Sequence, residues 1–346
     1  MKKYLFLSLC LFLIMACGKN SSKNDTKDTV NNADSVIVEN VAPVVIDTLT
    51  AGDIKMKKEL LYDKYTLQDE YYYRKSKNDS VLRVFQWDVM KERLAFLENL
   101  QKEPSSWAVL QNYKNRNGES PLVKTFVRNE YTRISDDFGV ERYQSVALFS
   151  PEDTLQAERY GRDGSLAKVY LSEQDSLSDF IPVETVYPKG KWMVNKKYVK
   201  VMGDTVCFDH VVFVDITNQN ITTMMKEGEE WIIRSMNPAT TGVHKPPYAH
   251  ETPVGMFVIQ EKKRKMVYLK DGSSETGGFA PYASRFTNGA YIHGIPSVHP
   301  STTEIEYSSS LGTIPRSHMC VRNASSHARF VYENMPVMQS VIFVID

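Results

Sequence analysis

The chain has 346 residues, with 42 basic and 42 acidic side chains, and therefore carries no formal net charge. Its 19 Tyr, 15 Phe and 4 Trp exclude disorder over the whole length. The charge balance leaves no basic excess for neutralising phosphates, which excludes a nucleic-acid binder that depends on one. Four cysteines are too few for a disulfide scaffold. At about 150 residues per domain, the length allows roughly two domains.

The first seventeen residues predict an export signal. Lys2 and Lys3 precede an apolar run, residues 4–15, that is too short to span a bilayer permanently. The segment Leu-Ile-Met-Ala-Cys that ends at Cys17 resembles the lipobox of bacterial lipoproteins. This resemblance implies removal of a signal peptide, residues 1–16, and acylation of Cys17, which would anchor the chain in a membrane. An ordinary secretory peptide with an incidental cysteine is the alternative.

Residues 17–40 comprise this cysteine and a stretch rich in Lys, Asn, Asp, Ser and Thr. Such a composition buries too little apolar surface to offset its ordering entropy, which predicts a disordered tether. Gly18 follows the cysteine, where lipoproteins of the inner membrane typically carry Asp. We therefore expect a periplasm-facing protein anchored in the outer rather than the inner membrane.

Residues 41–202 predict a mixed α/β domain. Apolar side chains recur at three- and four-residue steps between residues 81 and 100, which indicates an amphipathic helix. The same period extends through residues 107–113 and predicts further helix. From Leu122 onward, short alternating runs separated by Pro and Gly predict the strands of a small β-unit.

The end of this region has the pattern Trp-x-Val-x4-Val, formed by Trp192, Val194 and Val199. The pattern resembles the end of bacterial SH3-like domains, which often bind cell-wall peptides. It implies an SH3-like unit near residues 135–202 that would position the protein or recognise the wall. The alternative is another small barrel, since aromatic residues are common in the strands of any such fold.

Candidate catalytic residues lie in the last 140 positions. A cysteine nucleophile needs a nearby imidazole and hydrogen-bond donors for the oxyanion. His318 lies two residues before Cys320, so an extended segment would place both side chains on one face. His293 lies 27 positions before Cys320 and can meet it only through the fold. Residues 294–316 are long enough to cross between strands or to form a covering flap.

Residues 208–346 contain further landmarks in a fixed order. A buried-looking strand, 211–215, and a turn at 218–220 predict a hairpin. The remaining landmarks are Glu251-Thr-Pro-Val-Gly-Met-Phe257, Tyr282-Ala-Ser-Arg-Phe286, Tyr291-Ile-His-Gly294 and Arg316-Ser-His-Met-Cys-Val-Arg322. Together they resemble the catalytic domain of YkuD-type L,D-transpeptidases. The resemblance implies a mainly β catalytic domain, a YkuD-like β-sandwich with a small helix, after the mixed α/β N-terminal domain.

The resemblance also implies roles for individual residues. His293, held by the carbonyl of Gly294, would activate Cys320, the nucleophile. His318 and the backbone N–H groups of Met319 and Cys320 would form the oxyanion region. Further positions would line the substrate pocket or wall its groove: Ser317, Arg322, Tyr282, Arg285 and Phe286.

The implied reaction is cysteine acyl transfer on peptidoglycan stem peptides, without cofactor or metal. Cys320 would attack the diaminopimelate carbonyl of a tetrapeptide stem and release the terminal D-Ala. An acceptor amine would then yield a 3-3 cross-link or attach a protein, and carbapenems would acylate the enzyme. The alternatives are an L,D-carboxypeptidase that uses water, and a non-catalytic peptidoglycan-binding lipoprotein.

Three departures from the family concern the cysteine segment. Met319 stands where relatives usually have Gly, and it would be strained if the position needs a positive φ. Asn323 replaces the usual Met or Leu, and the polar insertion between His293 and Ser317 is longer than usual, which predicts a surface flap.

The same histidines and cysteines allow two other interpretations. A metal cluster is disfavoured because its candidates lack the usual ligand spacings: His293, His299, His318, His327 and Cys320. A Cys207–Cys320 disulfide would block the nucleophile. The basic run 261–265 is most simply a solvated turn or strand face, and wall binding is its alternative.

Overall fold

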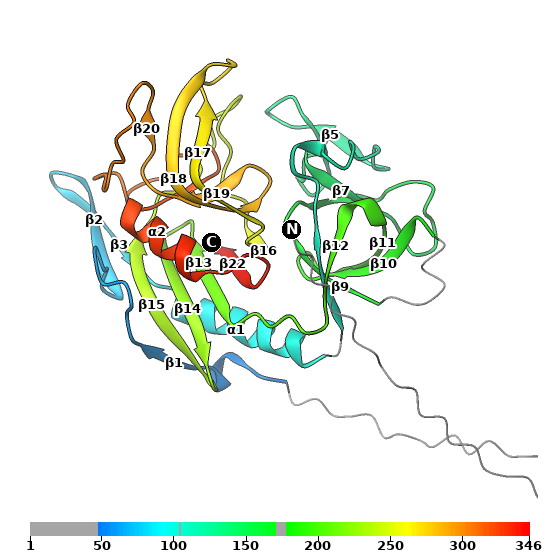
Figure 1. Ribbon diagram of the computed structural model, residues 1–346, viewed down its shortest axis with the longest axis horizontal. Coiled ribbons are helices and arrows are strands. Elements are labelled where there is room, and N and C mark those ends of the chain that lie inside the picture. Colours follow the sequence, from blue (N-terminus) through cyan, green and yellow to red (C-terminus); the bar gives the residue numbers. More distant parts are fainter. Residues whose placement is uncertain (1–47, 104, 171–177) are drawn as a thin grey trace, which may run out of the picture. The chain divides into compact units, whose positions relative to one another are not determined.

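The computed structural model describes residues 48–103, 105–170 and 178–346 (Figure 1). The predicted signal peptide, Cys17 and the tether lie outside the described residues, so their assignments stay predictions. In the described ranges, no helix has the length and apolar character needed to cross a membrane.

A six-stranded sheet forms the centre of the region that resembles a YkuD catalytic domain, and we call it the catalytic sheet after that resemblance. In spatial order its strands are β1 (Lys55–Lys58), β15 (Glu230–Pro238), β14 (Asn220–Glu227), β13 (His210–Asp215), β22 (Ser340–Ile345) and β16 (Gly255–Val258). The strands β13 and β22 pair in parallel and read as nearly continuous apolar runs, because both of their faces are covered. The expected hairpin is present: β13 pairs antiparallel with β14, and Asp215 accepts a hydrogen bond from the Asn218 N–H at 2.7 Å.

A second sheet packs on one face of the first. Its strands are β17 (Glu261–Leu269), β18 (Thr276–Thr287), β19 (Ala290–His293) and β21 (Val321–Arg322), and β20 (Ser297–Val298) pairs with β18. Side chains alternate across β13, so Val212 and Val214 meet Phe286 and Ile292 in a core between the sheets. Val331 of helix α2 (Ser325–Asn334) belongs to this core. The predicted β-sandwich with a small helix is thereby confirmed.

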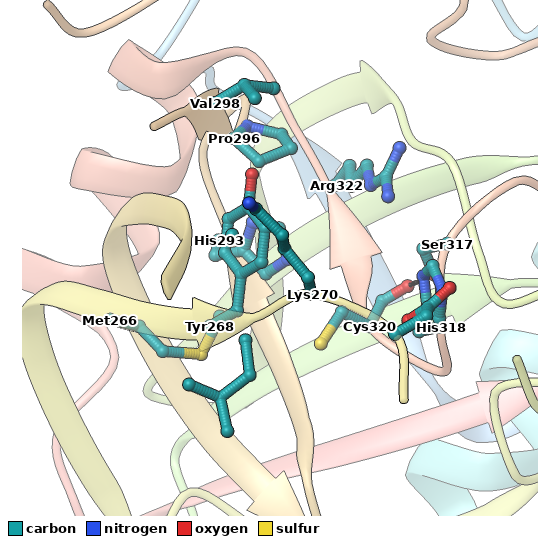
Figure 2. Close-up of a pocket in the computed structure, with 13 residues that line it drawn as sticks. Met266, Tyr268, Lys270, His293, Pro296, Val298, Ser317, His318, Cys320 and Arg322 are labelled. Carbon is teal, nitrogen blue, oxygen red and sulfur yellow. Dashed lines mark hydrogen bonds and ion pairs between the residues drawn. The ribbon is translucent and has the colours of Figure 1, made fainter. Parts of the chain in front are cut away.

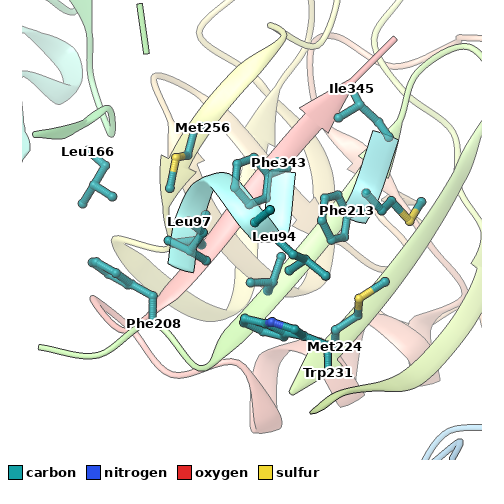
Figure 3. Close-up of a cluster of buried hydrophobic side chains, with 14 of the residues drawn as sticks. Leu94, Leu97, Leu166, Phe208, Phe213, Met224, Trp231, Met256, Phe343 and Ile345 are labelled. Carbon is teal, nitrogen blue, oxygen red and sulfur yellow. The ribbon is translucent and has the colours of Figure 1, made fainter. Parts of the chain in front are cut away.

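The other face of the first sheet is covered by helix α1 (Trp87–Lys102). Leu94 and Leu97 of α1 pack with Phe213 and Trp231 of the sheet in a further core (Figure 3). The predicted amphipathic helix exists, but it supports the catalytic sheet, and β1 extends that sheet at its edge. The described residues consequently form one compact unit, and the expected domain boundary between residues 202 and 208 stays a prediction.

The remaining N-terminal segment is sheet-rich. Its five-stranded sheet has the order β11 (Gly190–Asn195), β10 (Phe180–Thr185), β9 (Leu166–Val169), β4 (Ser106–Leu110) and β12 (Val199–Gly203). Three separate strand pairs occur in the described residues: β2 (Glu70–Ser76) with β3 (Asp79–Val84), β5 (Phe126–Arg128) with β6 (Ile134–Asp136), and β7 (Ser145–Leu148) with β8 (Arg159–Arg162). Short 3₁₀ turns occur at Ala51–Asp53, Tyr113–Asn115 and Lys196–Tyr198. We call residues 106–203 the β-unit.

The expectation of helix through residues 107–113 is wrong. Ser106–Leu110 is strand β4, which is buried between β9 and β12. Tertiary pairing outweighs the local period there, since Trp107 and Leu110 face opposite sides of a covered strand. The SH3-like character of the β-unit stays a prediction.

The position of α1 yields a prediction about stability. Leu97→Ala removes a fully buried side chain between α1 and the catalytic sheet, so it should lower the free energy of unfolding by about 2–5 kcal/mol. Urea denaturation followed by tryptophan fluorescence measures this loss. Leu155→Ala, at a position 96% exposed, is the matched control and should change stability by less than about 0.5 kcal/mol. Equal effects of the two substitutions would contradict the assignment of α1 to the core.

Candidate active site

Parallel strand pairing brings the two predicted catalytic segments together. Ile292 pairs with Val321 and His293 with Arg322, and the Asn323 N–H donates to the His293 carbonyl at 2.9 Å. Cys320 immediately precedes β21, so its side chain lies at the same edge as His293. Both residues line one cavity of about 470 Å³ (Figure 2).

The β17–β18 hairpin covers this cavity. Met266 and Tyr268 of its first strand line the cavity, as do Leu269 at the end of that strand and Lys270 and Asp271 in the hairpin connection. The insertion 294–316 contributes only Pro296 and Val298. Most of the cavity cover therefore comes from this hairpin, and less comes from the predicted flap. The basic run 261–265 lies in β17 and forms a strand face, as expected.

His293 is held in one tautomer. Its Nδ1 lies 2.6 Å from the Gly294 carbonyl, which can only accept, so Nδ1 carries the proton and Nε2 is free to accept one. This is the contact that the family resemblance implied. Gly294 is required because a Cβ there would lie 2.5 Å from the Ser325 Oγ. Burial lowers the pKa of His293 to about 4, so the imidazole is neutral at pH 7.

Cys320 is a free, partly exposed cysteine. Its Sγ–H donates to the Gly289 carbonyl, with 3.6 Å between the heavy atoms, rather than to the imidazole. Burial raises the pKa of the thiol, while the Tyr291 backbone N–H and the Arg322 charge act in the opposite direction. The resting site consequently holds a neutral thiol and a neutral imidazole, which line the same cavity. Proton transfer must then accompany attack, since no thiolate–imidazolium pair is formed beforehand.

The segment that carries the cysteine is tied to the loop after β15. The Ser317 N–H donates to Thr241 O at 3.0 Å, and the Val243 N–H donates to Ser317 O at 3.0 Å. The Ser317 hydroxyl donates to the Cys320 carbonyl. Within the described part of the chain, the N–H groups of Met319 and Cys320 have no hydrogen-bond partner. They are thus available to an oxyanion.

Met319 adopts a φ of +96°, in the region that favours glycine. The position therefore needs glycine for backbone reasons, and the expected strain on methionine is present. The Met319 carbonyl accepts from the Thr252 hydroxyl at 2.8 Å, and its side chain packs against the core between the sheets. These contacts hold the unusual conformation.

His318 and Arg322, two side chains at the cavity, differ in their pairing. His318 Nε2 lies 3.0 Å from the Asp271 carboxylate, so this half-exposed imidazole contacts the hairpin rather than an oxyanion position. Arg322 forms no ion pair with any described residue, and its Nε is buried without a partner. Burial lowers the pKa of Arg322, and the side chain offers an unpaired cation to an anionic ligand.

The comparison with protein families agrees with this geometry. Residues 209–343 match the family model described as the L,D-transpeptidase catalytic domain, YkuD. This region is a YkuD L,D-transpeptidase catalytic domain. A comparison with curated proteins finds no match.

Solved structures of three proteins illustrate the similarity. A fused Zn-dependent amidase/peptidase/peptidoglycan-binding domain-containing protein from Clostridium acetobutylicum is 18% identical over 39% of this chain, with a TM-score of 0.28, and the chain spans 51% of it, about half its length. An L,D-transpeptidase from Mycobacterium smegmatis is 17% identical over 58% of this chain and 99% of its own, with a TM-score of 0.33. L,D-transpeptidase 3 from Mycobacterium tuberculosis, solved with a faropenem-derived adduct, is 15% identical over 54% of this chain and 93% of its own, with a TM-score of 0.32.

Three residues expected to wall the groove lie elsewhere in the YkuD domain. Phe286 is fully buried in the core between the sheets. Arg285 is buried in an ion pair with Asp163 of the β-unit, at 2.5 Å. Tyr282 is buried beneath Arg264, whose Cζ lies 3.8 Å from the ring centroid. The prediction failed because β18 is covered along this stretch, and the sequence contains no signal of the partners that cover it.

The alternative readings of the YkuD domain also have outcomes. Cys207 and Cys320 are both free, so the disulfide alternative is wrong. Across residues 48–103, 105–170 and 178–346, no group of three or more His, Cys, Asp or Glu side chains is arranged to hold a metal ion. The two-residue step between Met266 and Tyr268 in β17 was the signal in the sequence that could have revealed these two side chains as cavity residues.

The backbone of Met319 yields the second prediction. Met319→Gly and Met319→Ala both remove the side chain, but only glycine relieves the left-handed strain. We expect the glycine variant to be about 1 kcal/mol more stable than the alanine variant in urea unfolding. Equal stabilities would show that the position imposes no strain.

The buried imidazole of His293 yields the third. Its pKa is about 4 when folded and 6.5 when free, so between these pH values the unfolded chain binds a proton that the folded chain does not. Stability therefore falls as the pH drops through this window, by about 2 kcal/mol at pH 5 from this group alone. Urea unfolding at pH 7 and pH 5 should show a smaller loss in His293→Asn than in the parent. His299→Asn, at an exposed histidine, is the control, and a parent-like loss in His293→Asn would contradict the prediction.

Proposed function

We propose that the YkuD domain is a cell-wall L,D-transpeptidase that uses Cys320 as its nucleophile. The observation that supports this most is the β19–β21 pairing, which places a free thiol and an imidazole with a free Nε2 on one cavity. The substrate is a peptidoglycan tetrapeptide stem, whose carboxylate pairs with the unpaired Arg322 guanidinium. The β17–β18 hairpin covers the bound stem and limits the access of water.

Each step of the proposed reaction has a residue to carry the proton. His293 Nε2 accepts the proton of the Cys320 thiol while the sulfur attacks the diaminopimelate carbonyl. The N–H groups of Met319 and Cys320 stabilise the oxyanion. The protonated imidazole then donates to the leaving nitrogen, and D-Ala departs as a thioester forms.

The thioester is resolved by the reverse sequence. An acceptor amine gives its proton to Nε2 of His293 and attacks the thioester carbonyl, which regenerates the thiol and forms a new amide. The acceptor is a second stem, yielding a 3-3 cross-link, or an amine of a protein. The acylated Cys17 would hold the domain at the outer membrane, facing the periplasm.

Carbapenem acylation is the fourth prediction. A carbapenem should add its mass to the protein, as measured by intact mass spectrometry, and Cys320→Ala should abolish the adduct because it lacks the sulfur. Cys207→Ala removes the other free cysteine of the described residues and should leave the adduct unchanged. A folded, reduced parent protein without adduct would favour a non-catalytic wall-binding protein.

Reaction products separate transfer from hydrolysis. Incubation with tetrapeptide muropeptides should yield D-Ala and 3-3 dimers, detected by mass spectrometry. Release of D-Ala with tripeptides and no dimers would instead identify an L,D-carboxypeptidase.

A further inference from the structure

The turn between β18 and β19, residues 287–290, touches the sulfur of the candidate nucleophile. The Gly289 carbonyl accepts from the Cys320 thiol at 3.6 Å, and the N–H of Tyr291, directly after the turn, also contacts the sulfur. We call residues 287–290 the thiol turn. The position of this turn determines how the Gly289 carbonyl and the Tyr291 N–H lie against the sulfur, and how far the sulfur is exposed to water.

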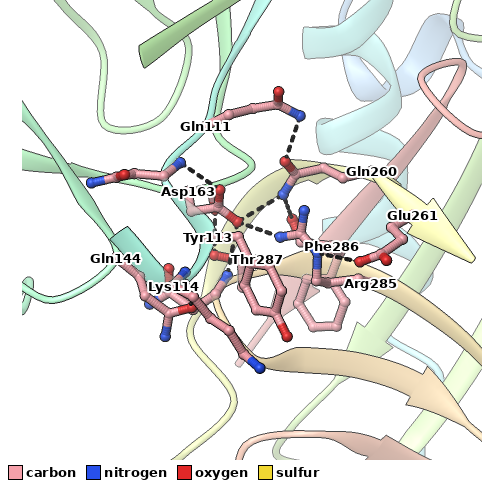
Figure 4. Close-up of polar contacts among 12 residues, drawn as sticks. Gln111, Tyr113, Lys114, Gln144, Asp163, Gln260, Glu261, Arg285, Phe286 and Thr287 are labelled. Carbon is pink, nitrogen blue, oxygen red and sulfur yellow. Dashed lines mark hydrogen bonds and ion pairs between the residues drawn. The ribbon is translucent and has the colours of Figure 1, made fainter. Parts of the chain in front are cut away.

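A single carboxylate of the β-unit holds the thiol turn (Figure 4). Asp163 is fully buried, and its Oδ2 accepts from the Arg285 guanidinium at 2.5 Å and from the Asn288 N–H at 3.1 Å. Its backbone carbonyl accepts from the Thr287 hydroxyl at 2.5 Å. The side chains of Arg285 and Thr287 and the N–H of Asn288 thus all bond to one residue that lies 122 to 125 positions earlier in the chain.

The other donors to this carboxylate keep it rigid. Gln260 Nε2 donates to Oδ2 at 2.9 Å and also to the Phe286 carbonyl at 2.9 Å, and the Asn112 N–H donates to Oδ1 at 2.8 Å. The next residue, Gly164, adds a steric constraint, since a Cβ there would lie 1.9 Å from the Phe286 carbonyl oxygen. The β-unit backbone therefore presses directly against the end of β18.

A second contact reaches the strand that follows the turn. The hydroxyls of Tyr113 in the β-unit and Tyr291 in β19 lie 3.3 Å apart. The Arg285 guanidinium stacks on the Tyr113 ring, with Cζ 4.3 Å from its centroid. Both sides of the thiol turn are consequently fixed by the β-unit.

We propose that Asp163 is a positioning residue of the active site, and that the β-unit acts as part of the catalytic structure by holding the thiol turn against Cys320. The proposal rests on the proposed function of Cys320, and Asp163 itself touches neither the sulfur nor the cavity. In low-dielectric surroundings, one residue whose carboxylate accepts four hydrogen bonds and whose backbone carbonyl accepts a fifth fixes its partners strongly. Small displacements of a reacting group cost large factors in rate.

The test replaces Asp163 with asparagine, which keeps the shape but faces the Arg285 and Gln260 donors with a weaker acceptor. The thiol turn should loosen and admit water to the sulfur. Since burial is the main cause that raises the pKa of Cys320, and Arg322 is the charged group that opposes it, the pH midpoint of Cys320 alkylation should move down by at least about one unit. Carbapenem acylation should slow about tenfold, because the sulfur is no longer held in place.

Asp136→Asn is the matched control. Asp136 is another fully buried aspartate of the β-unit, but its carboxylate accepts only from N–H groups of that unit, those of Phe138, Val140 and Tyr160. Both variants should lose stability, and only Asp163→Asn should shift the alkylation midpoint, which is measured by peptide mass spectrometry with iodoacetamide. An unshifted midpoint in folded Asp163→Asn would overturn the proposal.

A milder variant covers the case in which Asp163→Asn does not fold. Thr287→Val removes only the hydroxyl bond to the Asp163 carbonyl, and a shift in the same direction supports the proposal, whereas a parent-like profile overturns it. The alkylation readout does not depend on turnover. If the parent protein resists carbapenem while the midpoint still shifts, the proposed function fails and the positioning role stands.

Discussion

The candidate site depends on a two-residue strand. Val321 and Arg322 pair with β19 on one side, and on the other side Arg322 exchanges hydrogen bonds with Thr240, at 2.9 and 3.0 Å. This strand thus bridges the second sheet and the segment that follows β15 of the first. Cys320 stands immediately before it, so the sulfur is positioned by both halves of the sandwich. A shift of one residue in this register would move His293 and Cys320 apart and turn alternate side chains to the other face.

Burial determines the protonation state of the site. It lowers the pKa of His293 and raises that of Cys320, so both candidate catalytic groups rest in their neutral forms. A neutral imidazole can accept the thiol proton only while the sulfur bonds to carbon, which couples deprotonation to the bound substrate. Such a site avoids a permanently exposed thiolate, which is the form of cysteine most readily oxidised. The Arg322 cation and the unpaired N–H groups supply stabilisation when negative charge develops.

The sequence predicted those parts of the site that depend on local chemistry. Two such features are local in the sequence, and the structure contains both. The Gly294 carbonyl accepts from the neighbouring His293, and Met319 adopts the positive φ that favours glycine. The hairpin of β13 and β14 also followed from its apolar pattern, whereas the sandwich as a whole was implied by the family resemblance. Failures arose where distant partners decide the outcome: Arg285 is withdrawn from the groove by Asp163, and Ser106–Leu110 is a strand because two others flank it. No local pattern encodes a partner so far away.

The connectivity explains why the β-unit suits a positioning role. It begins at Ser106, just after α1 ends at Lys102, and it ends at Gly203, just before β13 begins at His210. Both neighbours belong to the catalytic sheet and its supporting helix, and Trp231 of that sheet donates a hydrogen bond to Glu98 of α1 at 2.7 Å. The β-unit is therefore held at both ends by the structure that it contacts at the thiol turn. The β-unit is restrained at its two chain connections and at the thiol turn, so it has little freedom to move away from that turn. It therefore holds the turn in a fixed position.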